Sequence, residues 1–215
     1  MNKNTNRIRT VIFSLLVTGS VIPALGQKYE VGKNAHSHND YLQKQPFYTA
    51  HGNGFASMEI DVFQAGNALC VAHEEKDIDP NRTIESLYIE PLLRQIKLNG
   101  NNKAYKDGGS LQLMIDLKTN GALALRLLES KLKPIRHYFD LRKNPDAIKL
   151  VITGDAPAAA AFKDYDEIFY FDGKRNTPYT PQQLDRVAFF SANFQDFSKW
   201  NGLGRMISPD SLRAR

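Results

Sequence analysis

The sequence predicts an α/β protein with a mostly parallel sheet, either open or closed into a barrel. Short runs of apolar, β-branched or aromatic residues recur along the chain, as expected of strands. Segments with helical spacing lie between several of these runs, and strands that alternate with helices are typical of parallel sheets. The chain has no tandem repeat and no long Pro/Gly/Ser linker, so we expect one domain.

Seven segments are candidate strands. Besides the segment around His36, they are 57–63, 68–73, 111–117, 148–154, 168–171 and 187–192. Helical spacing of apolar residues is found at 84–99, 121–139 and 180–187. In an α/β protein the ligand lies at the carboxyl ends of the strands. Polar residues at those ends are therefore the first candidates for a functional site.

The first 26 residues have the pattern of a secretory signal peptide. Three basic residues precede an apolar run from Val11 to Leu25, and small residues stand at positions −3 and −1 relative to the expected cleavage after residue 26. A membrane anchor is the less favoured alternative, because a spanning helix needs about 20 apolar residues. We expect export to the periplasm or the cell exterior, with 27–215 as the mature domain and no stable membrane span after cleavage.

Charge and cysteine content exclude two further classes. Part of the formal charge of +5 comes from basic residues in the expected signal peptide. The remaining Lys and Arg residues are scattered and not interleaved with aromatics. We therefore expect no nucleic-acid partner. Cys70 is the only cysteine of the chain, so no internal disulfide can form.

Three acidic residues are candidate metal ligands. Glu59 and Asp61 stand two apart in a candidate strand, so both carboxylates project from one face. Two acids on an inward face repel each other unless a cation lies between them. Asp116 ends another apolar run, where a ligand is expected. Carboxylate oxygens suit Mg²⁺ or Ca²⁺, whereas an exposed edge strand with its polar residues outward is the simpler alternative.

Basic residues stand near these acids in the sequence. Lys118 follows Asp116 by two positions and could hold a phosphate oxygen. His73 ends the run "ALCVAH" and could transfer a proton. His36 and His38 share a parity, so their spacing does not choose between them. The alternative is a set of unrelated polar loops, since a lone histidine after a strand is more often structural.

The order and spacing of these motifs resemble the glycerophosphodiester phosphodiesterase and phosphatidylinositol-phospholipase-C-like superfamily. The closest match is to the family named altered inheritance of mitochondria protein six. The motifs that carry the resemblance are "HSHNDY" (36–41), "EIDV" (59–62), "LCVAH" (69–73), "NRTIESLYIEPL" (81–92), "LMIDLK" (113–118), "FYFDG" (169–173) and "SANF…SKWNGLG" (191–204). The resemblance covers nearly the whole expected mature chain.

The resemblance implies a phosphoric diester hydrolase that acts on a glycerophosphodiester or phospholipid-type substrate. It implies a TIM (β/α)₈ barrel of the phospholipase-C-like type, with one divalent cation, Mg²⁺ or Ca²⁺. The motif positions assign residues as follows: Glu59, Asp61 and Asp116 to the metal, His36 and His73 to acid–base catalysis, and Lys118, His38 and Asn39 to phosphate or substrate. His36 is preferred to His38 because similar venom sphingomyelinase-type enzymes have histidine followed, after two residues, by asparagine.

Seven candidate strands fall short of a complete barrel, which has eight. We therefore expect the barrel to lack its last one or two strands in this chain. Two other functions remain open. One is a dinuclear metal phosphoesterase or amidohydrolase that uses His36 and His38 as ligands, and the other is a non-catalytic barrel that binds a lipid headgroup or a glycan.

Overall fold

The structure, a computed structural model, describes residues 32–100, 102–106, 108–206, 208 and 210–211. The expected signal peptide, residues 1–26, lies outside the described residues. Within the described ranges there is no helix with the length and apolar character of a membrane span.

A strand is found at each of the seven expected places. The strands are β1 (Gly32–Ser37), β2 (Phe55–Ala65), β3 (Ala68–Val71), β4 (Gln112–Leu117), β5 (Lys149–Gly154), β6 (Phe169–Gly173) and β7 (Val187–Phe190). Six of them form a parallel sheet in the order β1-β2-β4-β5-β6-β7. Strand β3 is the exception, because it turns back at Gly66 and pairs antiparallel with the end of β2.

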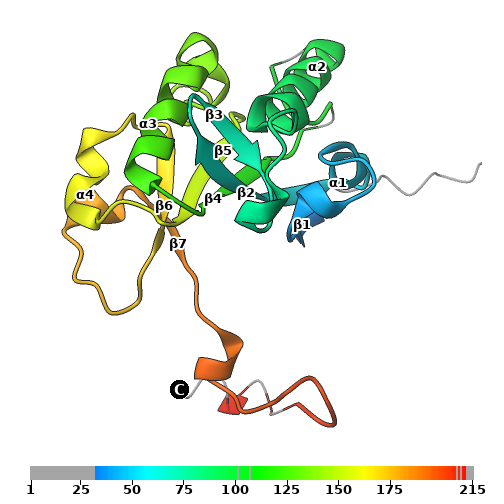
Figure 1. The fold of residues 1–215 in the computed structure, drawn as a ribbon. Helices are drawn as coiled ribbons and strands as arrows, with labels where there is room; N and C mark the ends of the chain where they lie inside the picture. The colour runs from blue at the N-terminus through cyan, green and yellow to red at the C-terminus, as the bar shows by residue number, and fades with distance from the viewer. Residues whose placement is uncertain (1–31, 101, 107, 207, 209, 212–215) are drawn as a thin grey trace, which may run out of the picture.

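Two helices of ten or more residues form in the segments expected to be helical. The α-helices are α1 (Tyr48–Gly52), α2 (Glu90–Asn99), α3 (Gly121–Leu132) and α4 (Pro181–Leu184). A π-helical turn, η3 (Glu85–Ile89), leads into α2. Single 3₁₀ segments are η1 (Asp40–Leu42), η2 (Glu75–Asp77), η4 (Lys133–Tyr138), η5 (Ala159–Asp164) and η6 (Phe194–Asp196). Figure 1 shows α2 and α3 above the sheet and the chain after β7 running away from it.

The expected (β/α)₈ barrel is wrong. The structure is instead a curled, mostly parallel sheet, a half-barrel with few helices. Six parallel strands span only part of the circumference of an eight-stranded barrel, and β3 adds none because its direction is reversed. The connections also differ, because only a 3₁₀ segment joins β5 to β6 and a four-residue helix joins β6 to β7.

The curl brings the two ends of the sheet toward each other. Residues of β1, including His36, and residues at the end of β7, including Phe189, line one cavity of about 580 Å³. Lys149 of β5 lines the same cavity, and burial lowers the pKa of its ammonium group. The concave side of the sheet is therefore hollow and partly polar.

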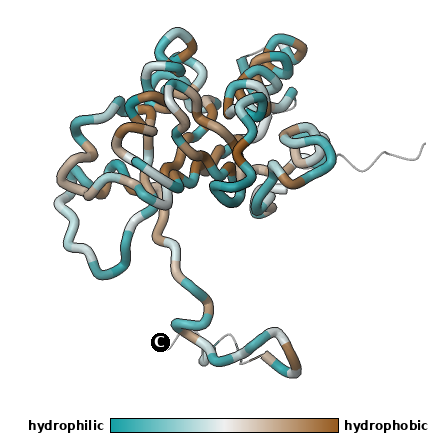
Figure 2. The backbone as a smooth tube through the Cα atoms, viewed as in Figure 1, coloured by the Kyte–Doolittle hydropathy of each residue, from teal (hydrophilic) through white to brown (hydrophobic). Residues whose placement is uncertain are grey.

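The convex side of the sheet carries the core. In β2 the residues Met58, Ile60 and Val62 are completely buried, and their apolar side chains alternate with Ser57, Glu59 and Asp61. The helices contribute buried leucines to the same cluster, among them Leu92 of α2 and Leu128 of α3. Figure 2 shows the hydrophobic segments gathered in the centre of the molecule, where the strands lie. This packing leaves the concave face free for polar side chains.

Candidate active site

The acidic residues of β2 and β4 meet on the concave face. Asp61 stands directly opposite Asp116 in the parallel pairing, and Glu59 lies two residues before Asp61 on the same strand. One carboxylate oxygen of each residue lies within 4.8 Å of those of the other two. Glu59 and Asp61 are only 8% and 1% exposed. The structure therefore brings together all three expected metal ligands.

Asp61 has one carboxylate oxygen with a full set of donors and one with none. Its Oδ2 accepts hydrogen bonds from the Tyr41 hydroxyl at 2.7 Å and interacts with the Lys118 ammonium at 2.9 Å. Its Oδ1 is buried and has no hydrogen-bond partner. A buried charged oxygen without a partner is costly, and most such oxygens in proteins are satisfied. We call the cluster of the Glu59, Asp61 and Asp116 carboxylates the acid group. It suits a cation at Asp61 Oδ1, because hard divalent ions prefer such oxygen donors.

Lys118 partly neutralises the acid group. Its ammonium lies 2.6 Å from Asp116 Oδ2 and 2.9 Å from Asp61 Oδ2. Burial opposes the charge of Lys118, but its hydrogen bonds to Asp116 and Asp61 outweigh burial and raise its pKa. Lys118 therefore stays a cation, and three carboxylates facing one ammonium leave an excess of negative charge.

His36 and His38 both approach Glu59. His36 Nε2 lies 3.2 Å from Glu59 Oε2, and its Nδ1 lies 2.9 Å from the Ser57 hydroxyl oxygen. His38 Nε2 lies 3.6 Å from the same Glu59 oxygen, and its side chain is 73% exposed. His36 is therefore held at both ring nitrogens, whereas His38 reaches the site from the rim.

His73 approaches the acid group beside Asp61. Its Nδ1 lies 3.1 Å from the Tyr41 hydroxyl and 3.4 Å from Asp61 Oδ2. Burial and then the hydrogen bond to Asp61 raise the pKa of Tyr41, so its hydroxyl keeps its proton and donates a hydrogen bond to Asp61. The hydroxyl oxygen can then accept a hydrogen bond from the Nδ1–H group of His73, which leaves Nε2 available for chemistry.

The "HSHNDY" turn is held from below by Asp40. Asn39 adopts the left-handed conformation, with φ of 49°, and turns the chain from β1 into η1. Asp40 is completely buried, and its carboxylate accepts hydrogen bonds from the hydroxyls of Ser37 and Tyr88 and from the backbone amide of Phe47. Asp40 is therefore a structural residue that fixes the positions of its neighbours in the motif.

The segment "NRTIESLYIEPL" supports the same turn. The Tyr88 hydroxyl donates a hydrogen bond to Asp40 at 2.9 Å, and the Arg82 guanidinium donates one to the backbone carbonyl of Tyr41 at 2.9 Å. Burial and then the charge of Asp40 raise the pKa of Tyr88, which keeps it a donor. The segment 81–92, for which the sequence predicted no catalytic or binding role, thus positions the turn that carries His36 and His38.

A family model decides which family this arrangement belongs to. The model of the AIM6-like phosphodiesterase domain matches residues 28–172. The chain belongs to this family. The matched region of the AIM6-like domain contains all eight site residues expected from the sequence, from His36 to Lys118. Membership in a phosphodiesterase family supports the hydrolase class.

Curated relatives carry the family name. The chain is 30% identical over 195 residues to the altered inheritance of mitochondria protein 6 homolog of Arthroderma benhamiae, an alignment that covers 79% of this chain and 59% of the relative. Altered inheritance of mitochondria protein 6 of Eremothecium gossypii is 31% identical over 160 residues, with coverages of 65% and 41%. The protein of the same name from Saccharomyces cerevisiae is 29% identical over 151 residues, with coverages of 60% and 39%. The chain thus spans about two fifths to three fifths of these relatives, and no solved structure matches it.

Two side chains of the AIM6-like domain gain a role only in the structure. Ser57 contacts His36, and the parity that it shares with Glu59 could have indicated this. Tyr41 bridges Asp61 and His73, although its place in the "HSHNDY" motif gave no sign of that geometry. The bridge makes Tyr41 a candidate positioning residue.

Replacing Tyr41 by phenylalanine is expected to lower phosphodiester turnover about tenfold, because supporting partners of metal ligands typically contribute that much. The change removes the hydroxyl that contacts both Asp61 and His73 and keeps the buried ring. Steady-state kinetics on bis(p-nitrophenyl) phosphate measures the effect. Tyr48→Phe is the matched control, because Tyr48 is 38% exposed and lies outside the acid group. Equal turnover of the two variants would remove Tyr41 from the site.

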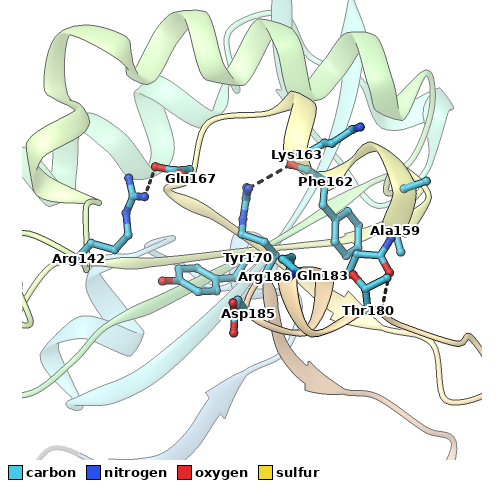
Figure 3. Close-up of a pocket in the computed structure, with 12 residues that line it drawn as sticks. Arg142, Ala159, Phe162, Lys163, Glu167, Tyr170, Thr180, Gln183, Asp185 and Arg186 are labelled. Carbon is cyan, nitrogen blue, oxygen red and sulfur yellow. Dashed lines mark hydrogen bonds and ion pairs between the residues drawn. The ribbon is translucent and has the colours of Figure 1, made fainter.

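A second cavity, of about 620 Å³, lies away from this centre between η5 and α4 (Figure 3). The two arginines that line it are already bound to other groups of the protein. Arg142 forms an ion pair with Glu167, and Arg186 donates to the backbone carbonyls of Phe162 at 3.1 Å and Asp166 at 2.8 Å. Burial lowers the pKa of Arg186. These contacts tie the segment before β6 to Arg142 and Arg186 and give both arginines a structural role.

Proposed function

We propose that this chain is a metal-dependent phosphoric diester hydrolase that acts on a glycerophosphodiester or phospholipid-type substrate. The observation that carries the proposal is the buried, unpartnered Oδ1 of Asp61, which lies in a group of three carboxylates flanked by two imidazoles. Family membership independently supports phosphodiester chemistry.

Glu59, Asp61 and Asp116 would hold one divalent cation, Mg²⁺ or Ca²⁺. When bound, such a cation offsets negative charge at phosphate oxygens. Lys118, which already sits between two of the acids, would contact a phosphate oxygen as a point charge. His38 and Asn39, in the turn that follows β1, would contact the substrate.

His36 and His73 would move the protons. One imidazole removes a proton from the attacking hydroxyl, and the other protonates the leaving oxygen. His36 is oriented by Ser57 and Glu59, and His73 by Tyr41 and Asp61. The contacts of His73 are at Nδ1 alone, whereas His36 is held at both ring nitrogens, so both rings have a fixed orientation. Activity after export to the periplasm or the cell exterior is part of the same proposal.

Hydrolysis of bis(p-nitrophenyl) phosphate by the protein with Mg²⁺, Ca²⁺ or EDTA tests the proposal. We expect turnover that needs the metal and is absent in the Glu59→Ala/Asp61→Ala variant. Glu90→Ala/Asp164→Ala is the matched control, because it removes two exposed carboxylates outside the acid group. Turnover that persists in EDTA, or in the Glu59→Ala/Asp61→Ala variant, would contradict the proposal.

Metal stoichiometry separates the proposal from the alternatives. One ion per chain, lost in the Glu59→Ala/Asp61→Ala variant, is expected. Two ions that depend on His36 and His38 would favour a dinuclear phosphoesterase or amidohydrolase. A folded protein that binds neither ion would favour a non-catalytic binding barrel.

A further inference from the structure

A polar cleft adjoins the acid group at the carboxyl ends of β5 and β6. Its volume is about 770 Å³. Thr153 and Asp172 line its floor, and the loop after β6 contributes Lys174 and Arg175. The carboxyl ends of parallel strands are where α/β proteins bind ligands, so the cleft lies on the functional side of the sheet.

Gly154 connects the cleft to the candidate metal centre. Gly154 lines the cleft, and a Cβ atom at this position would lie 1.9 Å from Asp116 Oδ1. Its φ of +72° also favours glycine. Thr153 is the direct neighbour of Asp116 in the sheet, and its hydroxyl donates to Asp172 at 3.3 Å. Two strand spacings, about 10 Å, therefore separate Asp116 from Asp172.

The side chains of Lys174 and Arg175 have no ion pair or hydrogen bond, within the described residues, of the kind that holds Arg142 and Arg186 in Figure 3. Among the described residues, neither Lys174 nor Arg175 forms an ion pair with a carboxylate. The Arg175 guanidinium instead lies over the Phe197 ring, 4.4 Å from its centroid. Stacking on an aromatic face orients the planar group and leaves its N–H donors free, and these donors match the geometry of a phosphate or carboxylate.

Two carboxylates, Asp172 and Asp196, line the cleft beside the two cations. Asp172 accepts hydrogen bonds from the Ser191 amide at 2.9 Å and from the Thr153 hydroxyl at 3.3 Å, so both its oxygens are engaged. Asp196, on η6, is the other carboxylate that lines the cleft. Lys174 and Arg175 therefore keep N–H donors that the carboxylate of Asp172 does not occupy, and such charged donors favour an anionic group.

We propose that this cleft binds a second anionic group of the substrate, a phosphate or carboxylate carried by the alcohol that is esterified to the scissile phosphate. Lys174 and Arg175 are the specificity-determining residues. The inference rests on the proposed phosphodiesterase function and names its substrate class as a phosphodiester with an anionic alcohol moiety. Because Asp116 and Asp172 are only two strand spacings apart, one substrate can contact both the acid group and the cleft.

The test uses p-nitrophenyl phosphodiesters that differ only in the second alcohol: ethyl, 2-carboxyethyl, 2-phosphoethyl and choline esters. We expect kcat/KM for at least one of the two anionic esters to exceed that of the ethyl ester by about tenfold or more, as charge-assisted hydrogen bonds predict. The better of the two identifies the anion. In Lys174→Ala/Arg175→Ala the ratio of kcat/KM for the anionic ester to kcat/KM for the ethyl ester should fall toward one.

The matched control is Arg94→Ala/Lys97→Ala, which removes the same two residue types from exposed positions on α2. Both double variants lower the net charge equally, so only a local role of the cleft distinguishes them. An unchanged preference in Lys174→Ala/Arg175→Ala, an equal loss in the control, or a preference for the choline ester in the unaltered protein would overturn the inference.

Calorimetry separates this inference from the proposed function. If no ester is hydrolysed, binding of 2-carboxyethyl ethyl phosphate, 2-phosphoethyl ethyl phosphate and diethyl phosphate is compared directly. Tighter binding of an anionic ester that depends on Lys174 and Arg175 would support the cleft even though hydrolysis fails. Equal binding of all three esters would overturn it.

Discussion

Replacing Asp61 by asparagine is expected to lower the affinity for Mg²⁺ or Ca²⁺ at least about 100-fold and to remove metal-dependent phosphodiester turnover. Asp61 is almost fully buried, and it supplies the unpartnered Oδ1 beside Glu59 and Asp116. An asparagine amide would lose the charge, and its N–H₂ group would face either the Tyr41 and Lys118 donors or the metal position. Either orientation is unfavourable for a cation.

The measurement for Asp61→Asn is the melting temperature with and without the metal, because a ligand that binds the folded state raises it. The unaltered protein should gain stability with metal, and the variant should not. Asp164→Asn, at an exposed position, is the matched control and should respond like the unaltered protein. An equal metal-dependent rise in Asp61→Asn would exclude Asp61 as a ligand.

Replacing His73 by alanine is expected to lower kcat by roughly 10²–10⁴-fold, the usual contribution of general acid–base catalysis. The metal affinity should stay nearly unchanged, because His73 contacts Asp61 Oδ2 and Tyr41 but is outside the group of three carboxylates. Turnover and metal-dependent melting, measured on the same protein, separate the two effects. His137→Ala is the control, since His137 is exposed on η4 and packs against Tyr138.

Comparing turnover of two substrates with different leaving groups shows which imidazole is the general acid. p-Nitrophenolate is a good leaving group that needs little protonation, whereas an alkoxide needs a proton from a general acid. If His73 is the acid, His73→Ala loses more activity on an alkyl diester than on bis(p-nitrophenyl) phosphate, and His36→Ala loses similar activity on both. The opposite pattern would exchange the two roles, and unchanged turnover of both diesters in His73→Ala would remove His73 from the mechanism.

Local sequence was sufficient to place the strands and the long helices. The alternation around Glu59 and Asp61 predicted one polar and one apolar face, and β2 has both. The apolar spacing in 84–99 and 121–139 predicted the helical segments that cover the core. These features depend on the period of side chains along a strand or a helix, which a sequence displays directly.

Local sequence could not predict whether the sheet closes into a barrel. The run at 68–73 was expected as one strand of a barrel, but β3 reverses at Gly66 and pairs antiparallel with β2. Its apolar pattern is the same in either direction, so periodicity cannot distinguish the two pairings. The short connections around β6 likewise became clear only from the fold, which is a half-barrel.

The sequence by itself predicted the candidate site residues that the structure brings together: the acids Glu59, Asp61 and Asp116 and the histidines that approach them. Only the tertiary structure decided that Tyr41 joins Asp61 to His73, that Asp40 is a buried support, and that Gly154 lies between the acid group and a cleft. The physical reason is that residue type sets what a group can do, whereas contacts between distant segments depend on how strands pair and where chains turn.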